Sequence, residues 1–398
     1  MTTGEDADFP GVDKIPFLQD EFIRKYSAIA CLEEQDVEEI LRLKEVLLHK
    51  ESFVRLLWEL HDHLYVQELP FHEVLPENPK LGRLLGDGLR GVFYYLLILS
   101  GIPLAFKRYK KRGWPEEMRD EIFSDLAVWV AHHKRNFGTP GFAWMVVGWF
   151  QNHINLTLLS FGRLQFNTSL SFPCKVKVFR NRHTDETVAM VSDAIRFTAE
   201  GLTDDLQEEP SSGNWTSSFA DHPQSWAGNK VSPDGRAQKH PSELLKTEWE
   251  LVLSPGDPVI NIHIPECGPL NPETCHDSMR RACDFFAKYL PEYPWKAFFC
   301  DSWILDPQLQ KILPRESNIL AFQRDAYLVP FPGEADTVFR CFGIKAARDG
   351  IGTVPLRTSL QRILVKFLKD GGRFHCGAFI LLREDTHPFK ANPYKQKF

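Results

Sequence analysis

The sequence predicts an α+β protein: a helical N-terminal domain, then a mixed, mainly antiparallel sheet with a parallel strand–helix–strand unit at its centre. Three observations support this prediction. Apolar residues recur at helical spacing up to about residue 157, the period then changes to two, and from Val259 a strand, a helix and a strand follow one another. The 398 residues suffice for two domains of ordinary size. We expect these domains to span 15–157 and 158–390.

Helices are expected throughout the first domain. Between Glu34 and Lys50 the apolar side chains recur every three or four residues, which places them on one helix face. Similar patterns occupy Phe53–Tyr65, Leu81–Ser100, Glu116–Lys134 and Phe142–Ile154. The apolar stretch Gly91–Phe106 is shorter than the ~18–20 residues of a membrane span and contains Pro103, so we expect a buried helix and no membrane span. The basic run that follows, Phe106–Arg112, indicates a solvated loop or a contact for an anionic ligand.

Strands are expected from about residue 158, because polar and apolar residues alternate between Arg163 and Leu170. The segment Thr203–Pro241 is rich in Ser, Pro, Asp and Gly and poor in aliphatic residues, so we expect a mobile insertion at 203–241 rather than a domain. The other predicted strands are Lys175–Arg180, Glu186–Val191, Trp249–Leu253, Val259–Ile264, Ala297–Cys300, Ile319–Val329, Thr337–Ile344 and Phe374–Leu382.

The central unit has clear boundaries. Asn271 is a natural N-cap, Pro272 occupies the first helical position, and Pro291 lies just past the end of the helix. Two strands that flank one helix at this spacing predict a right-handed crossover and a parallel pair. Further helices are expected after Asp306 and over Ser359–Lys369.

Composition excludes several classes of protein. A net charge of −6 argues against a general nucleic-acid binder, which needs a positive field. The 8 cysteines include no CxxC pair, and we expect reduced thiols in a cytoplasmic protein. The sequence contains no P-loop, dinucleotide fingerprint, nucleophile elbow or zinc motif, so no metal site is expected.

Three segments carry a family resemblance: "FGRLQF", "NIHIPECGPLNPE" and "FFCDSWILDPQLQKILPRESNILAFQR". They resemble proteins that join a helical N-acyltransferase N-terminal domain to a GNAT-like C-terminal domain, and the likeness covers about 15–390 except for 203–241. The resemblance implies transfer of an acyl group from acyl-CoA to an amine of a small molecule or peptide.

In GNAT proteins the strand before the central helix lines the pantetheine arm of acyl-CoA, and the helix N-terminus binds its pyrophosphate. On this resemblance Ile264, Gly268 and Asn271 are expected to bind the co-substrate. The usual glycine-rich pyrophosphate loop is absent, however. Two prolines of the loop lack an N–H, and Glu266 and Glu273 would repel a phosphate. A non-catalytic ligand-binding protein is therefore an open alternative.

His263 and Glu266 end the central strand, where a general base for an amine would lie. A core histidine and a solvated loop acid are the structural alternatives. Cys300, Asp301 and Ser302 end the adjacent parallel strand, the edge where such sheets bind ligands. There Asp301 would orient the amine and Ser302 would protonate the departing thiolate. Cys300 is either a buried hydrophobe or, with His263, the nucleophile of a thioester or amide hydrolase.

Substrate contacts are expected from Arg163 and Gln165, on the polar face of a strand, and from Trp303. An arginine there would bind a carboxylate or phosphate in a bidentate manner, with simple solvent exposure as the alternative. Gly268 would allow close backbone approach. We expect the cleft to open between the carboxyl ends of Val259–Ile264 and Ala297–Cys300, with the helical domain as one wall and the stiff "PECGPLNPE" loop as another.

Overall fold

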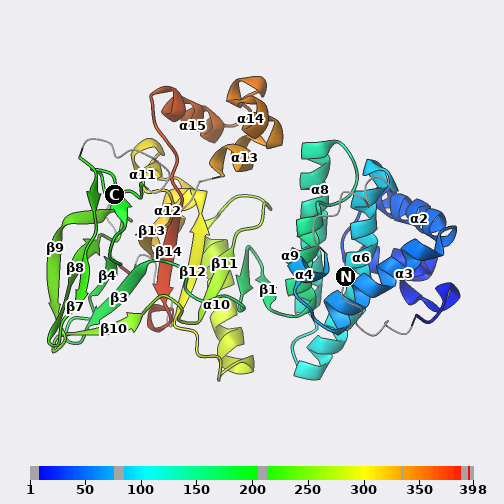
Figure 1. The fold of residues 1–398 in the computed structure, drawn as a ribbon, viewed down its shortest axis with the longest axis horizontal. Helices are drawn as coiled ribbons and strands as arrows, with labels where there is room; N and C mark the ends of the chain where they lie inside the picture. Colours follow the sequence, from blue (N-terminus) through cyan, green and yellow to red (C-terminus); the bar gives the residue numbers. More distant parts are fainter. Residues whose placement is uncertain (1–8, 76–84, 205–212, 333–335, 387–392, 395–398) are drawn as a thin grey trace. The chain divides into compact units, whose positions relative to one another are not determined.

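The computed structural model describes residues 9–75, 85–204, 213–332, 336–386 and 393–394 (Figure 1). Residue contacts divide the chain into two compact units. The first comprises Met1–Phe161 and Pro265–Cys267, and the second comprises Gly162–Ile264 and Gly268–Phe398.

The first unit is helical, as the apolar spacing predicts. Its last element is the strand β1 (Leu158–Phe161). The helices are α1 (Asp20–Ile29), α2 (Glu34–Leu48), α3 (Glu51–His61), α4 (Phe71–Val74), α6 (Asp87–Arg112), α7 (Met118–Phe123), α8 (Asp125–Phe137) and α9 (Trp144–Ile154), with short turns η1 (Val12–Lys14), η2 (Pro16–Leu18) and η3 (Asp62–Val66).

Helix α6 is the core helix of this unit. It is long and apolar enough to cross a membrane, yet 72% of its most apolar window is buried inside the structure. The basic run at its end is helical, which corrects the expectation of a loop. The Arg108 guanidinium donates hydrogen bonds to the carbonyls of Tyr65 (2.5 Å) and Ile154 (3.0 Å), so this cation joins three helical segments.

The second unit contains the predicted mixed sheet. Within this unit the strand order is β2-β11-β12-β14-β13, and the β11–β12 pair is parallel while the other pairs are antiparallel. The parallel pair confirms the central prediction. The bounds are β2 (Leu164–Asn167), β11 (Val259–His263), β12 (Ala297–Ser302), β13 (Tyr327–Pro330) and β14 (Gly377–Leu382).

A second, antiparallel sheet has the order β10-β3-β4-β8-β7, with β9 paired to β8. Val178 and Val191 of this sheet share one buried core with Val259, Phe299 and Ile380 of the mixed sheet, so the two sheets form a sandwich. The bounds are β3 (Val176–Asn181), β4 (Thr187–Val191), β7 (Phe219–Asp221), β8 (Ser225–Val231), β9 (Ala237–Leu245) and β10 (Trp249–Leu253), and a separate ribbon pairs β5 (Arg196–Phe197) with β6 (Trp215–Thr216).

The helices of this unit include the predicted central one. In α10 (Pro272–Tyr289), the Asn271 side chain accepts a hydrogen bond from the backbone N–H of Glu273, so the predicted N-cap is confirmed. The other helical elements are η4 (Trp303–Leu305), α11 (Leu309–Ile312), α12 (Asn318–Arg324), α13 (Thr337–Phe342), α14 (Ile344–Asp349), η5 (Ile351–Thr353), α15 (Ser359–Lys369) and η6 (Arg383–Asp385).

Three expectations are corrected. In the described part of 203–241, residues 213–241 build β6, β7, β8 and the first half of β9. The predicted strand Ile319–Val329 is mostly the helix α12, and only its end belongs to β13. The predicted strand Thr337–Ile344 is the helix α13 and the start of α14.

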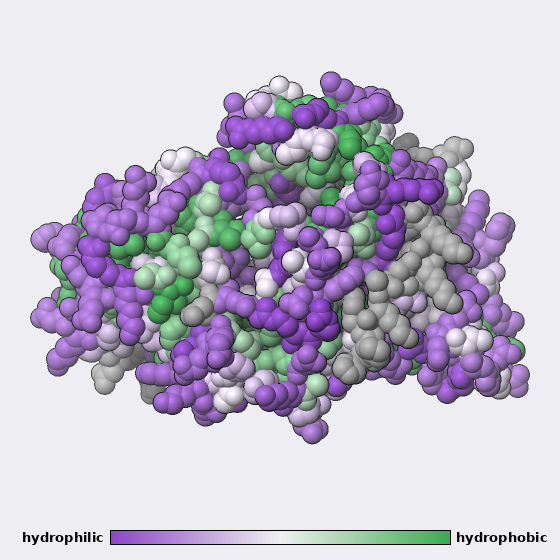
Figure 2. Space-filling view, turned by 180° about the vertical axis from the view of Figure 1, so that it is seen from behind, coloured by the Kyte–Doolittle hydropathy of each residue, from purple (hydrophilic) through white to green (hydrophobic). Residues whose placement is uncertain are grey.

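The many aromatic side chains build the cores. The largest fully buried side chains are tyrosines and phenylalanines of both units, among them Tyr95, Phe150, Phe179 and Tyr327. Hydrophilic residues dominate the face drawn in Figure 2, and hydrophobic residues appear there in patches between them. Many of the aromatic side chains therefore serve the packing of the cores.

Candidate active site

The strands β11 and β12 separate at their carboxyl ends. Their ladder runs from Val259, opposite Ala297, to Asn261, opposite Phe299, and ends there. Beyond this point β11 continues beside β2 as far as His263, and β12 continues beside β14 as far as Ser302. We call this place the fork, and it comprises Asn261–His263 of β11 and Cys300–Ser302 of β12. Carboxyl ends of parallel strands are the usual ligand-binding edge of such sheets.

Polar side chains gather on one face of the sheet at the fork. Asn261 lies opposite Asn167, and His263 lies opposite Gln165. Asp301 follows Phe299 by two residues and therefore shares its face. Gln165, Asn167 and Asn261 are almost fully buried, with 3–4% exposure each. The apolar core of the sandwich lies on the same face, nearer the amino ends of β11 and β12. The polar side chains thus form a band that begins where the core ends, and we call it the polar band.

Two asparagines of this band have different partners. The Asn167 Oδ1 accepts hydrogen bonds from the backbone N–H (2.8 Å) and the hydroxyl (2.5 Å) of Ser169, which is a local turn. The Asn261 side chain lies near enough to the Asp301 carboxyl group to lower its pKa. Its own Oδ1 is buried and has no hydrogen-bond partner within the described part of the chain. A buried amide oxygen left in this state is costly, which is typical of a group that binds a ligand.

Asp301 has the properties of a base. Its side chain reaches solvent, yet the surrounding protein removes much of its hydration. This desolvation raises the pKa of the carboxyl group above the ordinary value, and the neighbouring Asn261 side chain offsets part of the rise. The ionised carboxylate is therefore a stronger base than an aspartate in water.

Cys300 is a poor nucleophile in this setting. Its neighbour Asp301 shares a face with Phe299, so the thiol lies on the opposite face from the polar band, and it is buried with 1% exposure. Burial raises the pKa of this thiol well above its ordinary range, and the nearby Asp301 carboxylate raises it further. The geometry favours the interpretation of Cys300 as a small core residue and argues against the hydrolase alternative.

Ser302 and Trp303 form the turn after β12. The Ser302 hydroxyl oxygen accepts a hydrogen bond from the backbone N–H of Ile304 (3.4 Å), which leaves its own proton available for donation. Trp303 packs at the edge of a core shared by Leu309, Leu320 and Leu364. Its position favours a structural role over the expected substrate contact.

The loop between β11 and α10 is fixed by Arg163. Its guanidinium donates hydrogen bonds to the carbonyls of Pro269 (3.0 Å) and Gly268 (3.2 Å). Arg163 thus holds the loop instead of standing exposed on a strand face. Gly268 has a φ of 79°, and an added Cβ would meet nothing within 4 Å. The glycine is explained by its backbone conformation and not by the close approach expected from the sequence.

The remaining loop residues have separate roles. The Asn271 side chain is occupied as the cap of α10 (3.0 Å to the Glu273 backbone nitrogen). Ile264 is half-buried at the end of β11. Glu266 belongs to the first unit, where its carboxylate contacts the Arg135 guanidinium (2.8 Å) and the His132 Nδ1 (3.0 Å) on α8. These contacts hold the Glu266 carboxylate against α8.

Asn261 and Asn167 were missed in the sequence. Each stands in a short strand among hydrophobic residues, at an even spacing from a predicted polar residue of the same strand. That spacing is the signal that places Asn261 on the face of His263, and Asn167 on the face of Gln165.

Two family models match this chain. The model described as a GNAT-like C-terminal domain matches residues 158–380, and the model described as an N-acyltransferase N-terminal domain matches residues 26–156. The chain belongs to this GNAT-like family.

Solved acyltransferase structures share the fold of this GNAT-like protein. One is an acyltransferase mutant in complex with octanoyl-CoA, which is 22% identical, has a TM-score of 0.60, and is matched over 91% of this chain and 88% of that one. Another is an acyltransferase in complex with decanoyl-CoA and teicoplanin, which is 20% identical, has a TM-score of 0.55, and is matched over 96% and 91%. None of the curated proteins searched gave a significant match.

Proposed function

We propose that this GNAT-like protein transfers an acyl group from acyl-CoA to the amine of a small molecule or peptide. The observation that carries the proposal is the fork, where a parallel strand pair ends at an accessible carboxylate whose pKa is raised, beside a buried amide. The acyl-CoA complexes of structures with the same fold support the choice of co-substrate.

The chemistry assigns a role to each group. The neutral amine attacks the thioester carbonyl carbon, so a C–N bond forms and the C–S bond breaks. Asp301 takes the proton that the amine nitrogen loses. The CoA thiolate leaves and takes up a proton from solvent, because Ser302, next to Asp301 in β12, lies on the opposite face of the strand. The products are an amide and the free thiol of CoA.

Asn261 is a positioning residue in this scheme. Its side chain favours the ionised form of the Asp301 carboxyl group, and its buried Oδ1 is offered as an acceptor to an N–H of the bound substrates. Holding the reacting groups in a fixed geometry contributes to rate by removing the entropic cost of their encounter.

A binding protein without catalysis is the competing function, because the loop "PECGPLNPE" lacks the glycine-rich pyrophosphate motif. Calorimetric titration with octanoyl-CoA and with CoA, followed by an assay for free thiol in the presence of a set of amines, separates the two. We expect binding and amine-dependent thiol release. Binding without release from any amine would favour the binding protein, and no binding at millimolar ligand would refute acyl-CoA as the co-substrate.

A further inference from the structure

The second unit contains a helical cap that is strongly basic. The cap comprises residues 337–373, between β13 and β14, and includes α13, α14, η5 and α15 (Figure 1). It contains eight Lys or Arg and two Asp or Glu, a net charge of +6, in a chain whose net charge is −6. The rest of the chain is therefore acidic, and the positive charge is concentrated in one short segment. Such an asymmetry favours binding of the cap to an anionic partner.

The cap is attached to the edge of the mixed sheet that carries the fork. Pro330 ends β13 and pairs with Gly377 of β14, which pairs in turn with Ser302. Trp303, the next residue, packs against the apolar cluster that contains Leu364 of α15. The apolar core of the cap therefore adjoins the end of β12.

Helix α15 presents its cations as one stripe. Arg362, Lys366 and Lys369 follow one another at spacings of four and three residues, which places them on one face of the helix. All three side chains are exposed. The buried Leu364 lies two residues from both Arg362 and Lys366, so it points to the opposite face, into the core of the cap. The stripe is thus directed away from that core.

Most of the cations of the cap are available to a partner. Three of them form ion pairs of 2.6–2.8 Å: Arg340 with Asp336, Arg348 with Asp349, and Lys366 with Asp370. Exposed pairs of this kind are weak and exchange readily with other partners. The other five are exposed and have no ion pair in the part of the chain that the structure describes: Lys345, Arg357, Arg362, Lys369 and Arg373.

Apolar side chains lie beside these cations. Leu356 is 37% exposed and stands next to Arg357 in the loop before α15. Figure 2 shows hydrophobic and hydrophilic residues side by side at the top of the view, where Figure 1 places the cap. The apolar residues of α15 that are only half-buried are Leu360, Ile363, Val365, Phe367 and Leu368. Basic and apolar residues on one amphipathic segment are typical of proteins that bind the surface of a membrane.

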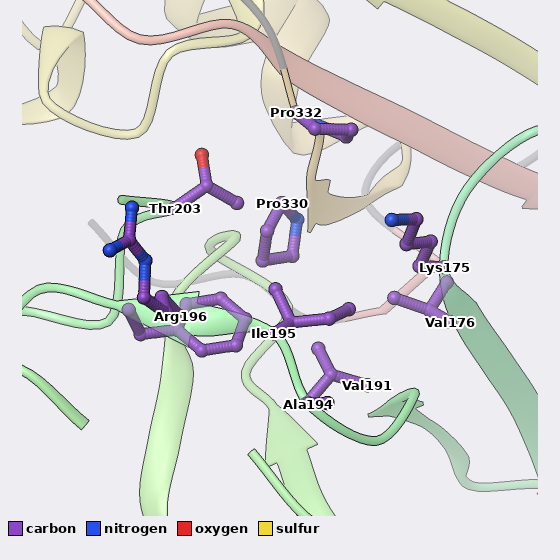
Figure 3. Close-up of a pocket in the computed structure, with 10 residues that line it drawn as sticks. Lys175, Val176, Val191, Ala194, Ile195, Arg196, Thr203, Pro330 and Pro332 are labelled. Atoms are coloured by element: carbon purple, nitrogen blue, oxygen red, sulfur yellow. The ribbon is translucent and has the colours of Figure 1, made fainter. Parts of the chain in front are cut away.

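The cations of the cap differ from those of the pocket drawn in Figure 3. This pocket has a volume of about 270 Å³ and is lined by Lys175 and Arg196, among other residues. The two cations lie on opposite sides, with Ile195 and Pro330 between them, so they cannot share one anion (Figure 3). The stripe on α15, in contrast, can contact one extended anionic surface with all of its members.

We propose that the cap docks this protein on an anionic lipid surface. The cations lie against the negatively charged headgroups, and Leu356 enters the boundary between headgroups and acyl chains. A nucleic-acid backbone would use the cations and leave Leu356 without a role. Because the cap adjoins the end of β12, docking also brings the fork near the lipid. The proposal does not depend on acyl transfer, and its test measures binding alone.

The test mixes the full chain with vesicles of phosphatidylcholine, with or without phosphatidylserine, and measures the bound fraction by co-sedimentation. We expect binding to the anionic vesicles that weakens as salt is raised, and much weaker binding to the neutral ones. Each cation near the surface contributes roughly fivefold to the affinity, so the triple variant Arg362→Gln, Lys366→Gln, Lys369→Gln should bind roughly a hundredfold more weakly. Leu356→Ser should weaken binding roughly fivefold at every salt concentration.

The matched control is the triple variant Lys107→Gln, Lys110→Gln, Lys111→Gln. It makes the same change of charge at exposed residues of α6, in the first unit, and should bind as the parent does. Melting temperatures of all variants check that they are folded. Absence of binding to anionic vesicles, equal binding to both kinds of vesicle, or an equal loss in the control overturns the proposal. Tighter binding to a short DNA duplex than to anionic vesicles at the same salt concentration would overturn it in favour of nucleic acid.

Discussion

Asp301 and Asn261 form the pair on which the proposed chemistry depends. The Asn261 side chain lowers the pKa of Asp301 against the larger effect of desolvation. In Asn261→Leu the polar amide is lost, so the pKa of Asp301 should rise further and the ascending limb of the pH–rate profile should move to higher pH. A profile of thiol release against pH measures the shift. If Asn261 had a purely structural role, Asn261→Leu would lower the stability of the protein and leave the ascending limb at the same pH.

A substitution of Cys300 tests the hydrolase alternative, because that mechanism requires the thiol. Because the thiol is buried, has a raised pKa and lies on the face of β12 opposite the polar band, Cys300→Ala should cost about 1 kcal/mol of stability and leave kcat within about twofold of the parent. Thermal melting and the thiol-release assay check both parts. Loss of all turnover in a folded Cys300→Ala protein would restore the cysteine mechanism.

Asp306 is a buried carboxyl group that should make the stability of the protein depend on pH. It has 1% exposure, and burial raises its pKa to about 6 although the backbone N–H groups of His375 and Gln308 each donate to it at 2.9 Å. A raised carboxyl pKa means that the folded chain holds the proton more tightly than the unfolded chain. The stability from this group is therefore complete below about pH 4 and is lost as the pH rises to about 6.

In Asp306→Asn this loss should disappear. From about pH 4 to pH 7 the parent should lose up to roughly 3 kcal/mol of unfolding free energy that the variant does not lose. Urea titrations of both proteins at the two pH values measure the difference. Parallel pH dependence in parent and variant would show that Asp306 does not carry the effect.

At the scale of the element, two of the three glycines of α6 lie in contrasting surroundings. A Cβ on Gly91 would lie 2.8 Å from the Cα of Gly141, where the Gly91 carbonyl also accepts a hydrogen bond from the backbone N–H of Phe142 (3.2 Å). Gly91→Ala should thus destabilise by about 1–3 kcal/mol and lower the melting temperature by several degrees.

Gly88 provides the matched control for this change. It lies one turn earlier in the same helix and has open space around it, so Gly88→Ala should be neutral or stabilising by up to about 1 kcal/mol. Equal melting temperatures for the two variants would mean that the close approach of Gly91 and Gly141 does not constrain the packing of α6.

The elements that could be predicted from sequence are those with strong periodicity and clear ends. Helix α10 has Asn271 as its cap and Pro272 at its first position, and both are observed. The segment Asn318–Arg324 is short and apolar, and such a run does not distinguish strand from helix by period alone. Strand β9 was missed because most of its residues are exposed and polar, so its place depends on pairing with β8 rather than on its own pattern.

The candidate site was predicted in outline for the same physical reasons. Asp301 and His263 could be placed because strand ends are visible in the sequence. The role of Arg163 as a support for the loop could not, because it depends on contacts with the carbonyls of Gly268 and Pro269, more than a hundred residues away in the chain. Composition likewise cannot show that Glu266 pairs with Arg135.

At the scale of the whole molecule, two family domains occupy one chain, and the proposed chemistry belongs to the GNAT-like one. The fork supplies the proposed base. It depends on the sandwich core for its rigidity, since the polar band continues from the buried residues that the two sheets share.

The most direct test of the central claim is the pH–rate profile of Asp301→Asn with octanoyl-CoA and an amine that the parent accepts. The control is Asp284→Asn, which removes an exposed carboxylate from α10. We predict that Asp301→Asn binds octanoyl-CoA as the parent does, that kcat falls by about 10²–10⁴, and that the ascending limb of the profile disappears, as expected for loss of a general base. A variant with the parent's kcat and the parent's ascending limb would contradict the assignment of the fork as the site of acyl transfer.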